Sequence, residues 1–125
     1  MKLSDKEFDR FVEKAIERIP PEIREHLDNM LITVLPKPSR IMLREAETPP
    51  GEILLGLFRG TPLTERCSVT APPLYPDTIF LFQQSLEEMC KTPEELEEEI
   101  EITVVHEVAH FMGISEKRLA ELGYD

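Results

Sequence analysis

The chain has little of several residue types that mark particular protein classes. It contains two cysteines, Cys67 and Cys90, and no tryptophan, and aromatic residues make up 6% of its 125 residues. Two cysteines and no apolar stretch at the N-terminus indicate free thiols and a cytoplasmic protein. No run approaches the roughly 20 apolar residues that span a bilayer, so we expect no membrane partner.

Positive charge is also scarce. The chain has 14 Lys and Arg against 25 Asp and Glu, which gives a formal net charge of −11. Phosphate groups would be repelled by such a surface, so we expect no nucleic-acid partner. No phosphate-cradling glycine loop and no GxSxG motif is present. The acidic balance favours a soluble protein whose partner is a peptide or protein substrate, cationic or neutral in charge, and a homodimer is left open.

Two of the three histidines lie in one segment, residues 104–113, with the sequence VVHEVAHFMG. In an α-helix, His106 and His110 lie one turn apart on the same face, and Glu107 directly follows the first. The other residues from 104 to 112 are apolar, so burial of three ionisable groups here is costly unless they gain a partner. The pattern predicts a zinc ion held by both histidines, with Glu107 acting on a water; the alternative is a buried helix whose histidines bond to backbone carbonyls.

Capping residues and apolar spacing predict an α+β fold, with residues 1–125 forming a single domain. A Ser4–Glu7 capping box starts a helix that ends at Pro20, and Thr92 with Glu95 starts the HExxH helix, which ends at Gly113. We expect a small mixed sheet packed against these two helices. The remaining expected elements are a helical turn at 22–28, strands at 30–35, 53–58 and 78–82, a loop at 59–77, and short helices at 85–90 and 115–122. Gly56 indicates a bulge or a close backbone approach, and the acidic run 94–101 indicates a solvated helix face.

A catalytic zinc ion normally has three protein ligands, so a third must be found outside the HExxH pair. We interpret His26 as a surface or core-edge residue, and Cys67 or Cys90 could in principle supply a thiolate. Glu116 is the preferred candidate, because a left-handed Gly113 would let the chain turn back toward the metal. An acidic residue at the start of the last helix is also favoured by the helix dipole.

The segment 106–116, HEVAHFMGISE, resembles the HExxHxxGxxD signature of the Asp-zincins. Segments 54–66 and 118–124 extend the resemblance to the small bacterial minimal zincin-like metallopeptidases. The resemblance implies a compact zincin-like fold, one Zn2+ held by His106, His110 and Glu116, Glu107 as catalytic base, and Tyr124 in support of the site. Glu116 departs from the signature, which has an aspartate there, by one methylene group.

These observations predict a zinc-dependent metallopeptidase that hydrolyses peptide bonds with Glu107 as general base. Tyr124, Tyr75 and Arg66 could each stabilise the oxyanion, and the sequence does not choose among them. An extended peptide could pair with strand 53–58 if that strand lies at a sheet edge. Two alternatives stand beside this hypothesis: a deformylase-like amidase with Cys67 as ligand, and a non-catalytic metal- or peptide-binding regulatory protein on the same scaffold.

Overall fold

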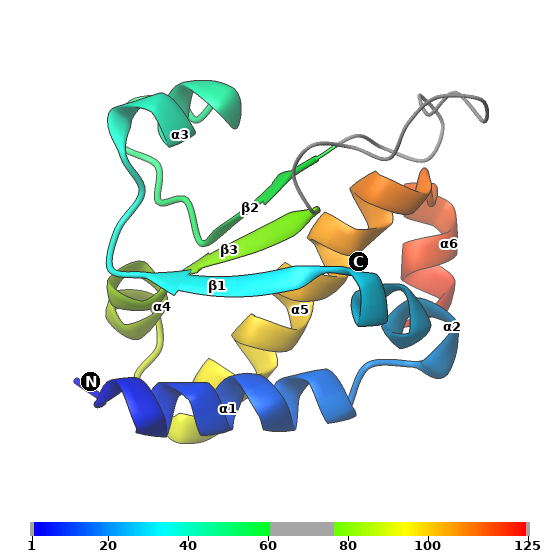
Figure 1. The fold of residues 1–125 in the computed structure, drawn as a ribbon, viewed down its shortest axis with the longest axis horizontal. Helices are drawn as coiled ribbons and strands as arrows, with labels where there is room; N and C mark the ends of the chain where they lie inside the picture. The colour runs from blue at the N-terminus through cyan, green and yellow to red at the C-terminus, as the bar shows by residue number, and fades with distance from the viewer. Residues whose placement is uncertain (1, 61–76, 125) are drawn as a thin grey trace.

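The computed structural model of the chain describes residues 2–60 and 77–124 (Figure 1). Its elements are α1 (Asp5–Glu17), α2 (Pro21–Arg24), the 3-10 helix η1 (Glu25–Asn29), β1 (Leu31–Leu35), α3 (Arg40–Glu45), β2 (Gly56–Arg59), β3 (Thr78–Phe82), α4 (Gln83–Met89), α5 (Pro93–Met112) and α6 (Glu116–Glu121). No helix in the described part of the chain is both long enough and apolar enough to cross a membrane.

The three described strands form a mixed sheet in the order β1-β3-β2. β1 runs parallel to β3, with Leu31 opposite Thr78, and β2 runs antiparallel to β3, with Phe58 opposite Ile79. This confirms the expected α+β class and the small mixed sheet. The central strand β3 follows an expected segment, 78–82, without any change of bounds.

Alternate residues of β3 face opposite layers, as the two-residue period of a strand requires. Ile79 and Leu81 are fully buried in the main core, which they share with apolar residues of α1 and α5. Phe82 belongs to a smaller cluster on the other side, with Met42 of α3 and Leu57 of β2. The sheet is therefore covered by α1 and α5 on one face and by α3 on the other.

α1 begins with the predicted capping box. The Ser4 hydroxyl accepts the Glu7 N–H at 3.2 Å, and the Glu7 carboxylate accepts the Ser4 N–H at 3.1 Å. The second predicted box is only half present. Thr92 accepts the Glu95 N–H, but the Glu95 carboxylate accepts the N–H of Lys91, one residue before the cap.

Gly56 lies where α5 approaches β2 closely. Of the two expectations for this residue, a bulge or a close backbone approach, the structure has the close approach. A Cβ at this position would lie 2.5 Å from Cγ2 of Thr103 and 3.0 Å from the carbonyl oxygen of Phe80. Real Cβ atoms do not tolerate the first distance, so only glycine allows this packing. The helix that carries the histidines is thereby held directly against the sheet.

Three expectations need correction. The strand expected at 53–58 begins only at Gly56 and extends to Arg59. α3 adds a helix that was not expected, with Ser39 accepting the Met42 N–H at 3.2 Å as its N-cap. Glu101 was included in a solvated acidic face, yet it is 8% exposed. Most of the expected loop 59–77 lies outside the described residues.

Candidate metal centre

The last two turns of α5 place the paired histidines, and the turn after α5 places Glu116. Gly113 adopts φ 71° and ψ 29°, which confirms the left-handed residue predicted at the helix end. The Ile114 N–H then bonds back to the Ala109 carbonyl at 3.0 Å. Ser115 caps α6 by accepting the Arg118 N–H, so Glu116 is the first residue of a new helix that turns back beside α5.

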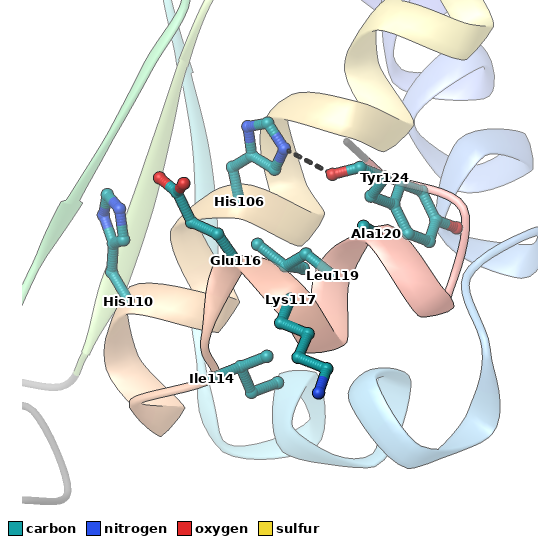
Figure 2. Close-up of a pocket in the computed structure, with 8 residues that line it drawn as sticks. All are labelled: His106, His110, Ile114, Glu116, Lys117, Leu119, Ala120 and Tyr124. Atoms are coloured by element: carbon teal, nitrogen blue, oxygen red, sulfur yellow. Dashed lines mark hydrogen bonds between the residues drawn. The ribbon is translucent and has the colours of Figure 1, made fainter.

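His106, His110 and Glu116 line one cavity of about 530 Å³. Figure 2 shows the Glu116 carboxylate directed toward the two imidazoles, with His106 and His110 projecting from successive turns of α5. Apolar atoms of Ile114, Leu119 and Ala120 form much of the remaining wall. The structure therefore brings the three predicted metal ligands to the same cavity from two helices.

Two imidazoles and a carboxylate are a donor set that zinc uses in catalytic sites, so the residues suit the metal in kind. Their spacing is wider than a bound ion requires. Within residues 2–60 and 77–124, no three His, Cys, Asp or Glu side chains are close enough together to hold a metal ion. Glu116 is exposed and forms no hydrogen bond with a described residue, so its side chain is free to adjust.

The other ligand candidates lie away from this cavity or outside the described residues. His26 is half-buried beside the ring of Phe111, with ring centroids 6.5 Å apart, as expected for a core-edge residue. Cys90 is buried just after α4 and does not line the cavity. Cys67, with Arg66 and Tyr75, falls outside the described residues.

Glu107 faces β2 and does not line the cavity. Its Oε1 accepts the backbone N–H of Phe58 at 2.6 Å. Burial raises the pKa of the Glu107 carboxyl, whereas the Phe58 N–H and the charges of His110 and His106 act in the opposite direction. One carboxylate oxygen is thus fixed by the strand, while the other forms no hydrogen bond with a described residue and can exchange a proton.

Tyr124 meets the site through its main chain. Its carbonyl oxygen lies 3.3 Å from Nε2 of His106. Its hydroxyl donates a 2.5 Å hydrogen bond to Oε2 of Glu101, and Figure 2 shows the hydroxyl pointing away from the two imidazoles. Burial and the Glu101 carboxylate both raise the pKa of Tyr124. The phenol is therefore engaged with Glu101, on the side of the ring away from the histidines.

Glu101 and Arg18 are supporting residues that the sequence interpretation missed. Oε1 of Glu101 lies 2.9 Å from Nε of Arg18, which also pairs with Glu97 at 2.8 Å. These contacts connect Arg18, the residue that caps the C-terminal end of α1, with α5 and with Tyr124. A signal was present, because Glu101 lies three residues before Val104 and seven before Val108, on the buried face of the helix.

Comparison with known proteins gives a consistent result. Residues 27–124, well over half of the chain, match the family described as zincin-like metallopeptidase. No curated protein matches the chain. The matched range contains the sheet, the whole of α5 and α6, and each residue of the cavity described above. The chain therefore belongs to the zincin-like metallopeptidase family.

Proposed function

We propose that this protein is a zinc-dependent metallopeptidase that hydrolyses peptide bonds. The observation that carries the proposal is the shared cavity of His106, His110 and Glu116, with Glu107 anchored beside it by the Phe58 N–H. Family membership supports the same class of reaction. A zinc ion, when bound, would lower the pKa of a water molecule and polarise the carbonyl oxygen of the substrate.

His106, His110 and Glu116 are the residues that would hold the ion. Glu107 is the general base: its unanchored oxygen takes a proton from the attacking water as the water oxygen bonds to the carbonyl carbon. The same carboxyl group then gives that proton to the leaving nitrogen as the carbon–nitrogen bond breaks. Burial raises the pKa of Glu107, and this favours the first step, because a more basic carboxylate accepts a proton more readily.

For Tyr124 we propose a supporting part in the site. Its carbonyl is placed to accept a hydrogen bond from the His106 ring and so to fix the orientation of the imidazole. The bond from its hydroxyl to Glu101 holds this carbonyl in place. From the sequence, Tyr124 was also a candidate for oxyanion stabilisation. Because its hydroxyl is bonded to Glu101 and points away from the two imidazoles, we favour the supporting role over oxyanion stabilisation.

A second candidate function is a non-catalytic metal- or peptide-binding protein on the same scaffold. It is favoured by the absence, among the described residues, of any three His, Cys, Asp or Glu side chains close enough together to hold a metal ion, since an incomplete ligand set would give weak metal retention.

The experiment that tests the proposal combines metal analysis with a peptide-library cleavage assay, with and without a chelator. We expect one zinc per chain and chelator-sensitive cleavage in the wild type. His110→Ala and Glu116→Ala should lose zinc, and Glu107→Gln should keep zinc and lose cleavage. Glu121→Ala, on the same helix as Glu116 but outside the cavity, is the matched control and should retain both.

Two outcomes would overturn this assignment. Loss of zinc in Cys67→Ser, with zinc retained in Glu116→Ala, would favour the deformylase-like alternative. Zinc binding without cleavage of any library peptide would favour the binding protein.

A further inference from the structure

β1 forms one edge of the described sheet, since β3 lies on only one side of it. The Leu31 N–H bonds to the Asp77 carbonyl at 2.9 Å, and the parallel register continues from there. In a parallel pair, alternate residues bond to the neighbouring strand, so the N–H and C=O groups of Ile32 and Val34 point away from β3. No described residue forms a hydrogen bond with these outward groups. They are a template for one more strand.

A groove of about 490 Å³ runs along this edge, between β1 and α1. Its wall includes the consecutive residues 32–36, together with Asp5 and Asp9 of α1 and Gln83 of α4. Because consecutive rather than alternate residues line it, the groove follows the edge of the strand and not one face of the sheet. Figure 1 shows β1 with α1 beside it and β3 on its other side. The groove shares no lining residue with the metal cavity.

The charged side chains that line this groove are both carboxylates. Asp5 and Asp9 are four residues apart, so they lie on the same face of α1. Both are exposed, and neither forms an ion pair or a side-chain hydrogen bond with a described residue. An occupant that supplies two positive charges would meet two carboxylates that form no ion pair with a described residue.

The spacing of these carboxylates matches that of an extended chain. Four residues of helix rise about 6 Å, and two residues of strand rise about 6.7 Å. Every second side chain of a strand paired with β1 would therefore come level with Asp5 and then with Asp9. A second copy of this chain is a poor occupant, because each copy carries a net charge of −11 and pairing would bring four of these aspartates together.

We propose that this edge groove is a docking site for an extended, basic segment of another protein. The segment adds a fourth strand beside β1 through the outward groups of Ile32 and Val34, and its alternate Lys or Arg residues pair with Asp5 and Asp9. The site is separate from the metal centre, so it does not depend on the proposed peptidase activity.

The test uses a short fluorescein-labelled peptide of alternating lysine and valine, with binding measured by fluorescence anisotropy at low and high salt. We expect the double variant Asp5→Asn, Asp9→Asn to weaken binding roughly fivefold to tenfold. Glu13→Gln with Glu17→Gln removes the same charge at the same spacing on α1, outside the groove, and should change binding less than about twofold. Added salt should weaken wild-type binding and narrow the difference between the two double variants.

Two further probes test strand pairing itself without altering the protein. They are the same peptide N-methylated either at its valines or at its lysines. In a paired strand, only one of these alternate sets of N–H groups faces β1, so one probe should lose binding and the other should keep it.

Equal binding of both methylated probes would overturn the strand-pairing model. An effect of the aspartate variant no larger than that of the control variant would overturn the role of the groove. Sedimentation of the unliganded protein tests the other possible occupant, which is a second copy of this chain. A dimer that the peptide fails to dissociate, and that the aspartate variant strengthens, would assign the edge to a second copy and overturn the proposal.

Discussion

The backbone N–H of Phe58 in β2 donates a 2.6 Å hydrogen bond to Oε1 of Glu107 in α5. This bond joins the edge strand β2 to the residue that directly follows the first histidine of the HExxH segment. It also occupies an N–H group that a peptide adding to β2 would use. Any substrate pairing along β2 therefore has to avoid Phe58 or displace Glu107.

Glu107→Gln separates the chemistry of this residue from its structural contact. Glutamine keeps an oxygen for the Phe58 N–H but cannot accept the proton of the attacking water. We expect peptide hydrolysis to fall by about 10²–10⁴-fold, the usual contribution of a general base, with zinc content unchanged. Turnover at the wild-type rate would remove Glu107 from this role.

The stability of the metal-free protein should depend on the protonation of the same carboxyl. Because burial raises the pKa of Glu107 in the folded state, the protonated form is favoured by folding. The contribution of the protonated carboxyl to the free energy of unfolding is fully present below the ordinary Glu pKa. It is lost as pH rises through the raised pKa of the folded state. Urea unfolding across this range should show the loss in the wild type and a smaller loss in Glu107→Gln, which is then the more stable protein at neutral pH.

Gly56→Ala should destabilise the protein by about 1–3 kcal/mol, because the new Cβ collides with Thr103 Cγ2 and the Phe80 carbonyl. Thr103→Ser removes the first of these obstacles. In a double-mutant cycle measured by urea unfolding, the double variant should therefore lose less free energy of unfolding than the two single losses added together. Strict additivity would show that the collision is relieved elsewhere.

Tyr124 should resist ionisation in the folded protein. Tyr75→Phe leaves it as the only tyrosine, so tyrosinate absorbance then reports on Tyr124 alone. The raised pKa favours the protonated phenol in the folded state, so its stabilising contribution is complete at neutral pH and is lost as pH rises through the raised value. In an alkaline titration of the folded protein, the tyrosinate absorbance should appear only at pH values above the ordinary tyrosine pKa near 10. In urea it should appear at pH values near that ordinary pKa.

Removing the Tyr124 hydroxyl leaves Glu101 with Arg18 as its partner. Tyr124→Phe should cost about 1–3 kcal/mol of unfolding free energy, measured by urea denaturation, because a buried carboxylate loses a hydrogen bond. A cost below about 0.5 kcal/mol would mean that water replaces the hydroxyl.

Cys90 should react slowly with thiol reagents. Its thiol is buried, and burial, with smaller contributions from Glu99 and Glu95, raises its pKa. The thiolate fraction at neutral pH is therefore small as well as poorly accessible. In Cys67→Ser, where Cys90 is the only thiol, labelling by Ellman's reagent should be slow in buffer and fast in urea. Rapid labelling in buffer would show that the region after α4 opens readily.

The local signals of the sequence predicted much of the helical framework. Ser4, Thr92 and Ser115 each cap the helix expected after them, and Gly113 ends α5 in the left-handed conformation. Such signals act within one helical turn, so they are readable without tertiary structure. The bounds of β2 and the presence of α3 were less accessible, because short elements depend on what packs against them.

The candidate site likewise has features that the local sequence predicts and contacts that only the tertiary structure reveals. The helical spacing of His106 and His110, and the turn that returns Glu116 beside them, are consequences of residues close together in the chain. The anchoring of Glu107 by Phe58 and of Tyr124 by Glu101 joins residues 49 and 23 positions apart. No periodicity or cap encodes such pairs.

The amino-acid sequence by itself thus determined where the helices start and stop and which face of α5 carries two imidazoles, because backbone capping and helical pitch are local properties. Only the tertiary structure decided the strand order β1-β3-β2, the burial of Glu101 and the contact of Glu107 with β2. Those features follow from how the apolar faces of α1, α5 and the sheet fit together. That fit depends on all the elements at once. It includes the close approach of α5 to the sheet, which Gly56 permits.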